Sequence, residues 1–147
     1  MQQYNSPVTA TSNSLSPRIK LKNTGTTAIN LSDVKLHYYY TIDGEKDQNF
    51  WCDWSTVGSS NVTGAFVKLP APLTGADHYL EIGFTSGAGS LAAGDSIELQ
   101  IRMNKTDWTN YTQTGDYSFD PTDSTYTDWS HTTGYVAGAL QWGTEPQ

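Results

Sequence analysis

The chain has 147 residues, a length that suits one domain with a core large enough to need no disulfide bridges. Its formal net charge is −7, and an acidic surface repels phosphate backbones and anionic lipids, so we expect neither nucleic acid nor a membrane as a partner. No apolar run approaches the roughly 20 residues of a membrane-spanning helix, and no signal segment opens the chain.

The residue types are those of an extracellular β-domain, so we expect a secreted protein. Charged residues make up 16% of the chain and aromatic residues 12%, with five tryptophans and nine tyrosines. Tyrosine and threonine suit half-buried strands, whereas glycine, asparagine, aspartate and serine favour turns. The single cysteine, Cys52, cannot form an internal disulfide and is expected to behave as a small apolar residue.

Alternating polar and apolar residues predict strands throughout the chain, and no helical pattern is long enough for a β–α–β unit. In chain order, the predicted strands cover residues 18–22, 34–42, 65–69, 79–84, 96–103 and 136–142. Turn signals such as Asp43-Gly44 separate them. Many short strands between turns predict a single all-β domain, an antiparallel sandwich, over residues 1–147. Residues 142–147 are expected to begin a linker.

The strand predicted at residues 96–103 has the clearest alternation. One of its faces carries Ile97, Leu99, Ile101 and Met103, and the other carries Glu98, Gln100 and Arg102. Side chains of a strand point alternately to the two sides of the sheet. We therefore expect the apolar set in the core and the polar set on the surface.

Motifs of common catalytic sites are absent from the sequence. The chain has no Gly-x-Ser-x-Gly nucleophile motif, no His-Glu-x-x-His zinc motif and no Gly-x-x-x-x-Gly-Lys phosphate loop. A glycosidase needs two carboxylic acids that face each other across a cleft, and no local feature of the sequence would raise the pKa of one of them. We therefore expect a protein that is not an enzyme, with carboxylates that serve solubility.

Two loops combine a carboxylate with a turn whose carbonyl groups point outward. They are residues 41–44, which include Asp43, and residues 112–116, which include Asp116. Calcium is bound by several hard oxygen atoms from carboxylates and carbonyl groups, often from loops that are distant in sequence. On residue types alone, each aspartate fits either a calcium site or a turn that its own side chain stabilises.

Five tryptophans are too many to assign all of them to the core by default. Trp51 and Trp142 lie in apolar runs and are expected in the core. Trp54 and Trp108 have polar neighbours, which favours exposure. An exposed indole ring can cover the C–H face of a sugar. Alternatively, each of these two tryptophans could cap an end of the sandwich.

Six ordered motifs resemble those of the family 3 carbohydrate-binding modules, which occur in cellulosomal scaffoldins and bacterial cellulases. The motifs cover residues 22–25, 36–44, 50–53, 107–111, 115–119 and 142–146. The resemblance extends from about Tyr4 to Pro146, nearly the whole chain. It implies a nine-stranded β-sandwich with jelly-roll topology, one structural calcium ion and non-catalytic binding of crystalline cellulose.

Residue by residue, the resemblance implies three sets of site residues. The planar strip of the family, in which an aspartate and an arginine pair in line with aromatic rings, corresponds to Asp53, Trp54, Arg102 and Trp108. The polar anchoring positions, which would reach neighbouring glucan chains, correspond to Asn13, Ser14, Gln100 and Tyr117. The calcium ligands correspond to carbonyl groups of Thr41, Thr112 and Gly115 and carboxylates of Asp43 and Asp116.

The chain departs from the best-known scaffoldin modules at three places. Trp54 stands where those modules carry histidine, which enlarges the stacking surface. The loop at residues 57–62 is shorter, and the strip tyrosine that it would carry has no counterpart. Pro7 replaces a polar anchoring residue. The shorter loop, without the strip tyrosine, predicts narrower or weaker binding.

The leading hypothesis is a module that binds crystalline cellulose and holds a covalently attached cellulase or scaffoldin at the plant cell wall. The alternative is a helper module, fused to a family 9 glycoside hydrolase, that feeds glucan chains to the active site. That subgroup typically loses the aromatic strip, whereas this chain keeps two tryptophans. A hydrolase in its own right and a protein-interaction module such as a cohesin are the remaining alternatives.

Overall fold

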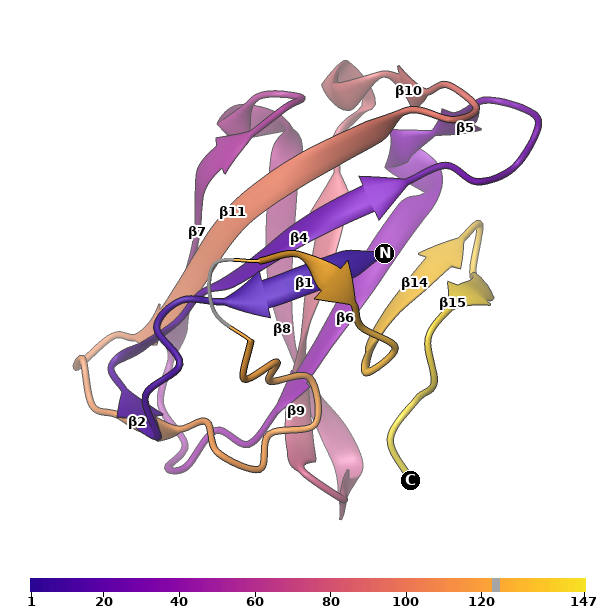
Figure 1. Cartoon of the computed structure of the whole chain (residues 1–147). Coiled ribbons are helices and arrows are strands. Elements are labelled where there is room, and N and C mark those ends of the chain that lie inside the picture. The colour runs from indigo at the N-terminus through magenta and orange to yellow at the C-terminus, as the bar shows by residue number, and fades with distance from the viewer. Residues whose placement is uncertain (123–124) are drawn as a thin grey trace.

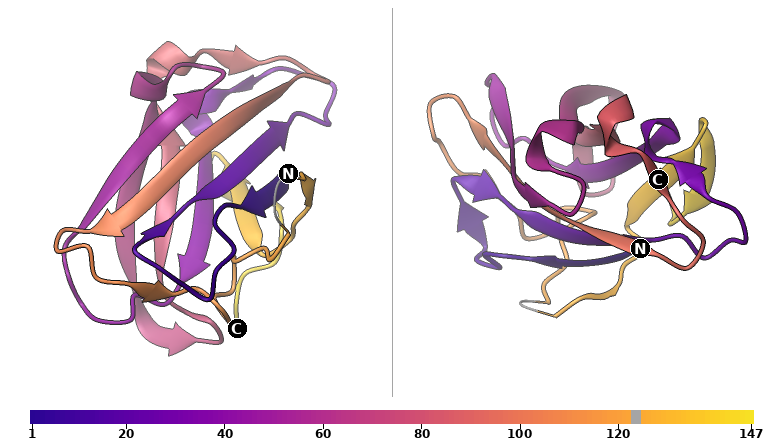
Figure 2. Two further views of the ribbon diagram at one scale, coloured as in Figure 1. Left: turned by 60° about the vertical axis from the view of Figure 1, so that its left-hand side comes forward. Right: turned by 90° about the horizontal axis from the view of Figure 1, so that it is seen from above.

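The structure, a computed structural model, describes residues 1–122 and 125–147. Two antiparallel β-sheets lie face to face and enclose the core, as Figure 1 and the right-hand view of Figure 2 show. Three short 3-10 helices occupy connections between strands: η1 (Leu31–Asp33), η2 (Ser59–Asn61) and η3 (Ser86–Ala88). No helix in this described part of the chain is long and apolar enough to cross a membrane.

The first sheet has six strands. Five of them follow the order β13, β1, β4, β11, β3, and β7 also pairs with β11. Their bounds are β1 (Gln2–Asn5), β3 (Ser14–Leu15), β4 (Pro17–Lys22), β7 (Gln48–Ser55), β11 (Ser96–Lys105) and β13 (Thr127–Asp128). β11 is the central strand, since it pairs with β4 and β3 as well as with β7.

The second sheet has five strands in the order β15, β14, β6, β9, β8. Their bounds are β6 (Val34–Tyr40), β8 (Val62–Leu73), β9 (Ala76–Phe84), β14 (Thr132–Val136) and β15 (Ala139–Trp142). Two small ladders lie outside the sheets. One joins β5 (Ile29–Asn30) to β10 (Ser90–Leu91), and the other joins β2 (Thr11–Ser12) to β12 (Tyr111–Thr112).

The chain crosses repeatedly from one sheet to the other. β4 of the first sheet is followed by β6 of the second, then by β7 of the first, β8 and β9 of the second, and β11 of the first. Such crossings between antiparallel sheets are typical of a jelly roll. The predicted antiparallel sandwich is confirmed. Fifteen strands are assigned in the described residues, six of them only two residues long, so a plain count does not reproduce the predicted nine.

Alternate residues of the facing strands fill the core. The apolar face predicted for β11 is confirmed, because its members are at most 5% exposed: Ile97, Leu99, Ile101 and Met103. From the second sheet, the core receives Leu36, Tyr38, Tyr40, Leu80 and Ile82. Full burial of one such side chain contributes about 1.5–3 kcal/mol relative to exposure. β11 is therefore firmly anchored, and its polar residues are held on the outer face of the sheet.

The structure differs from the predicted strands in several places, and β7 is absent from the prediction altogether. Residues 136–142 form a hairpin instead of one strand, because Ala137 and Gly138 have φ values of 50° and 83° and turn the chain between β14 and β15. β1 has no apolar alternation, because its inward residues are polar. Gln3 and Asn5 are fully buried, and the Gln3 side-chain amide donates to Asn5 Oδ1 at 2.9 Å.

The two sheets approach each other closely where Gly64 of β8 meets the ring of Phe50 of β7. A methyl group at position 64 would overlap this ring. We expect Gly64→Ala to lower the free energy of unfolding by about 1–3 kcal/mol, as overpacking of a core does. Urea denaturation measures the change.

The matched control combines Gly64→Ala with Phe50→Leu, whose smaller side chain leaves room for the methyl group. If the overlap with Phe50 is the cause, the double variant loses less stability than the sum of the two single variants. Strictly additive losses would show that the contact between Gly64 and Phe50 is not what limits the size of residue 64.

Candidate functional site

The outer face of the first sheet carries the predicted strip residues, and a β-bulge in β7 arranges two of them. Gln100 of β11 pairs with Trp54, whereas the next residue, Ile101, pairs with Cys52. Asp53 is therefore the extra residue of a bulge, which shifts the alternation of β7 by one. As a result, the consecutive residues Asp53 and Trp54 are both exposed, Trp54 by 46%.

Asp53 and Arg102 form an ion pair on this face, as the resemblance implies. Arg102 Nε donates to Asp53 Oδ1 at 3.0 Å and to Oδ2 at 2.9 Å. The Arg102 and Asp53 side chains are 36% and 47% exposed, so water screens the pair and its contribution to stability is small. The pair instead fixes the direction of the guanidinium group next to the bulge.

Trp51 lies on the same surface, although the apolar run around it predicts a core position. It is 44% exposed and pairs directly with Arg102 across the strands. The Arg102 guanidinium carbon lies 5.4 Å from the centre of the Trp51 ring, and Trp51 Nε1 donates to Asn104 Oδ1 at 2.9 Å. The core prediction is wrong because Phe50 and Cys52 take the inward positions. Only the pairing of β7 with β11 reveals this, and single-strand patterns do not contain it.

Trp108 lies in the turn that follows β11, on the far side of Arg102 from Gln100. Its φ of 60° is in the left-handed region, and its amide donates to the Lys105 carbonyl at 3.0 Å. Asp107 Oδ1 accepts hydrogen bonds from the Thr109 amide and hydroxyl at 3.2 and 2.8 Å. Trp108 is 52% exposed, so the exposure predicted for it and for Trp54 is confirmed.

Three of the four predicted anchoring residues lie on this face or beside it. Gln100 is two residues before Arg102 on β11, so both side chains point outward. Ser14 of β3 pairs with Asn104 of β11 and shares its side of the sheet. Asn13 precedes Ser14 and is exposed.

The structure separates Tyr117, the fourth predicted anchoring residue, from the other three. Its ring stacks on His131 at 4.1 Å and meets the Tyr39 ring edge-on at 5.9 Å. Tyr39 alternates with core residues of β6, so it faces outward from the second sheet. The Ser118 amide donates to the Tyr39 carbonyl at 3.0 Å, so the segment that carries Tyr117 lies beside β6. Tyr117 is therefore on the opposite side of the sandwich from the strip.

The aspartates of the two predicted calcium loops meet at Thr41. Thr41 Oγ1 lies 2.8 Å from Asp116 Oδ1 and 3.3 Å from each carboxylate oxygen of Asp43. The Thr112 amide donates to Asp43 Oδ2 at 2.8 Å, which brings the second loop to the first. Gly115 precedes Asp116 in a tight turn. The structure therefore brings the two loops, and all five predicted ligand residues, to one place.

The Asp116 carboxylate has an unusual environment for an acidic group. Its Oδ2 is buried and has no hydrogen-bond partner among the described residues. Burial raises the pKa of Asp116 to about 7; hydrogen bonds from Thr41 oppose this, and the negative charges of Asp43 and Asp77 add to it. A hard cation would satisfy the unpaired oxygen and keep the carboxylate ionised.

Any such site would depend on hydroxyl and carbonyl oxygens as well as on carboxylates. No group of three or more histidine, cysteine, aspartate or glutamate side chains that could hold a metal ion occurs in residues 1–122 and 125–147. The carbonyl oxygen of Gly115 also lies close to Gly75 in the turn between β8 and β9. This predicted ligand is therefore packed against a third loop.

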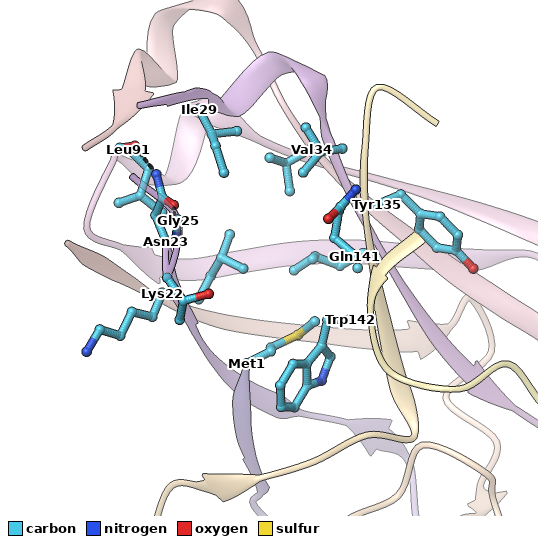
Figure 3. Close-up of a pocket in the computed structure, with 15 residues that line it drawn as sticks. Met1, Lys22, Asn23, Gly25, Ile29, Val34, Leu91, Tyr135, Gln141 and Trp142 are labelled. Atoms are coloured by element: carbon cyan, nitrogen blue, oxygen red, sulfur yellow. Dashed lines mark hydrogen bonds between the residues drawn. The ribbon is translucent and has the colours of Figure 1, made fainter. Parts of the chain in front are cut away.

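The sandwich also contains a largely apolar cavity, whose lining residues Figure 3 shows. Met1, Ile29, Val34 and Leu91 contribute apolar side chains to its wall. Trp142, which is expected in the core, is half-buried in this wall, and its Nε1 donates to the Trp129 carbonyl at 2.9 Å. No strip residue lines the cavity.

Comparison with known proteins identifies the family of the chain. The family model described as a cellulose binding domain matches residues 1–143. The chain belongs to this family. The resemblance to the family 3 carbohydrate-binding modules is thereby confirmed, and the chain is a non-catalytic binding module.

Similar modules occur as parts of longer proteins. The module is 60% identical to a xyloglucanase of a Paenibacillus species over 99% of its own length and 14% of that protein. It is 47% identical to cellulosomal-scaffolding protein B of Acetivibrio thermocellus over 97% of its own length and 19% of that protein. Among solved structures, the CBM3b module of the scaffoldin subunit ScaA of Acetivibrio cellulolyticus has 59% identity and a TM-score of 0.96, with 99% and 95% of the two chains covered.

The Asp53–Arg102 pair is expected to contribute little to the stability of the module. Each of Asp53→Asn and Arg102→Gln should change the free energy of unfolding by no more than about 1 kcal/mol, because solvent screens the two charges. Urea denaturation of both single variants and the double variant measures the coupling between them. A coupling energy well above this value would show that the pair is a structural element of the fold.

Proposed function

We propose that the module binds the flat surface of crystalline cellulose through the outer face of the first sheet. The supporting observation is a strip of exposed side chains that follows β11. Trp54 lies at one end of the strip, Trp108 lies in the turn at the other end, and the Asp53–Arg102 pair lies between them. Large exposed aromatic side chains in a row are characteristic of a binding surface.

The strip combines two kinds of contact with a sugar. Each tryptophan offers a flat ring that fits over the C–H face of a pyranose. Between the rings, the Asp53 carboxylate accepts and the Arg102 guanidinium donates hydrogen bonds to sugar hydroxyl groups. Trp51 supports this arrangement, because its ring and the Asp53 carboxylate both interact with the guanidinium. Side chains that are ordered before binding lose little conformational freedom, which favours binding.

We further propose that the module brings a covalently attached catalytic or scaffoldin module to cellulose. The support is that similar sequences form a small part of longer proteins, among them a xyloglucanase and a cellulosomal-scaffolding protein. Attachment to the substrate raises the local concentration of the linked module there. Because plant cellulose lies outside the bacterial cell, this role requires a secreted protein.

We infer that the loops of Asp43 and Asp116 hold a structural calcium ion. The buried, unpaired oxygen of Asp116 and the approach of a second carboxylate support this inference. Thr41, Thr112 and Gly115 would supply the further oxygen ligands. A bound calcium ion supplies positive charge to two neighbouring carboxylates. It would thereby hold together two loops that are about 70 residues apart in the chain.

The strip proposal predicts that Trp54→Ala/Trp108→Ala loses adsorption to microcrystalline cellulose. Truncation of an aromatic anchor typically removes about 2 kcal/mol or more, so we expect the association constant of the double variant to fall on the order of a hundredfold or more. Depletion of the protein from solution by microcrystalline cellulose measures this constant.

Leu140→Ala is the matched control for this test. Leu140 is a large apolar residue of β15 in the second sheet and is 44% exposed, close to the exposure of Trp54. Its variant should adsorb as the unchanged chain does. An unchanged chain that stays in solution would instead contradict cellulose targeting and favour the helper module of a family 9 glycoside hydrolase.

The calcium proposal predicts that a chelator lowers the melting temperature at neutral pH. A ligand at a hundred times its dissociation constant stabilises by about 2.7 kcal/mol, which corresponds to a shift on the order of 5–10 °C. Asp116→Asn should abolish the response to calcium. Asp107→Asn, which changes an exposed aspartate outside the two loops, should preserve it. Equal melting temperatures of the unchanged chain in calcium and in chelator would contradict the site.

A further inference from the structure

The outer face of the first sheet extends beyond the strip toward β4 and β1. Gln100 pairs with Trp54 of β7 and with Arg18 of β4, and Arg18 pairs in turn with Tyr4 of β1. These four residues form one cross-strand row. Figure 1 shows β7, β11, β4 and β1 following one another in this order.

Burial of the neighbouring residues shows that Tyr4 and Arg18 point outward. Gln3, Asn5 and Ile19 alternate with them along β1 and β4 and are fully buried. Tyr4 and Arg18 themselves are partly exposed. The row therefore adds a phenol and a guanidinium to the surface that carries Gln100.

The side chains at this end of the row are held by mutual contacts. The Arg18 guanidinium carbon lies 6.0 Å from the centre of the Tyr4 ring. The Tyr126 ring meets the Tyr4 ring edge-on at 4.8 Å. Burial is the main cause that raises the pKa of the Tyr126 phenol, and a hydrogen bond to Glu98 is the second. Within the described residues, no carboxylate forms an ion pair with Arg18.

The row and the strip run in different directions. The strip follows β11, whereas the row crosses the strands, which lie about 4.8 Å apart, so that Tyr4 is roughly 14 Å from Trp54. A glucan chain that lies along the strip covers β7 and β11 and leaves Arg18 and Tyr4 at its side. A twisted sheet turns away from a flat substrate with each strand, and arginine and tyrosine are long enough to span the resulting gap.

We propose that Arg18 and Tyr4 contact a second glucan chain, which lies beside the chain on the strip in the same cellulose surface. The inference rests on the proposed binding through the strip. Arg18 donates hydrogen bonds to hydroxyl groups of the second chain, and the Tyr4 phenol adds a further donor and acceptor. Only an ordered surface presents a second chain at a fixed distance. The contact therefore gives the module a preference for crystalline over amorphous cellulose.

Adsorption of Tyr4→Ala/Arg18→Ala to two forms of cellulose tests this contact. We expect the association constant for microcrystalline cellulose to fall about tenfold, because several hydrogen bonds are lost together. On acid-swollen amorphous cellulose, the loss should stay below about twofold. Thermal unfolding checks that the variant is folded. If it is not, Arg18→Gln, which removes the charge and keeps a long polar side chain, provides the same comparison.

Lys35→Ala/Tyr135→Ala is the matched control. These residues also form a cross-strand pair of a cation and a tyrosine, but on the outer face of the second sheet. This variant should adsorb to both substrates as the unchanged chain does. A loss as large as that of the Tyr4 and Arg18 variant would indicate a general effect of charge or stability and overturn the proposal.

Equal losses on the two celluloses, or no loss on the crystalline form, would also overturn the lateral contact. The two proposals can be told apart when they fail. If Trp54→Ala/Trp108→Ala adsorbs normally, binding through the strip is wrong and the lateral contact falls with it. If that variant loses adsorption while Tyr4→Ala/Arg18→Ala retains it on crystalline cellulose, only the lateral contact is wrong.

Discussion

The pairing of β11 on both of its edges is the constraint on which the rest of the structure depends. Its apolar residues fill the core, and this burial decides that Gln100 and Arg102 point outward. Strand pairing then places residues of its three partner strands on the same side, among them Trp51, Ser14 and Arg18. A shift of β11 by one residue would turn its charged side chains into the core, where an unpaired charge is very unfavourable.

The strip and the loops of the candidate calcium site are linked at the end of β11. Lys105 is only 1% exposed, and its ammonium donates to the carbonyl groups of Asp43 at 3.0 Å and Asn110 at 3.4 Å. The carbonyl of Lys105 accepts the amide of Trp108. One buried cation thus connects the loop of Asp43 to the turn that presents an exposed tryptophan. These hydrogen bonds couple the loop of Asp43 to the turn of Trp108.

Patterns within one strand were sufficient where burial alone decides the position of a side chain. The alternation of β11 is of this kind, whereas the exposure of Trp54 and Trp108 was predicted from the polar residues around them. Trp51 was assigned to the core because its apolar neighbours do not reveal which strand lies opposite it. The sequence pattern did not predict β1, because its buried residues, Gln3 and Asn5, are polar and form a hydrogen bond with each other. Tyr117 was placed by resemblance, which names a residue type at a position but does not say on which side of the sandwich it lies.

At Trp108, the left-handed backbone conformation lowers the stability of the fold, whereas the side chain has a proposed role in binding. A side chain with a Cβ atom is unfavourable in this conformation by roughly 1–2 kcal/mol, whereas glycine adopts it freely. Selection for stability alone would therefore favour glycine or asparagine at this turn. Selection for thermal stability in the absence of substrate would therefore tend to replace this tryptophan. The selected variants would have a higher melting temperature and, if the strip binds as proposed, a lower affinity for cellulose.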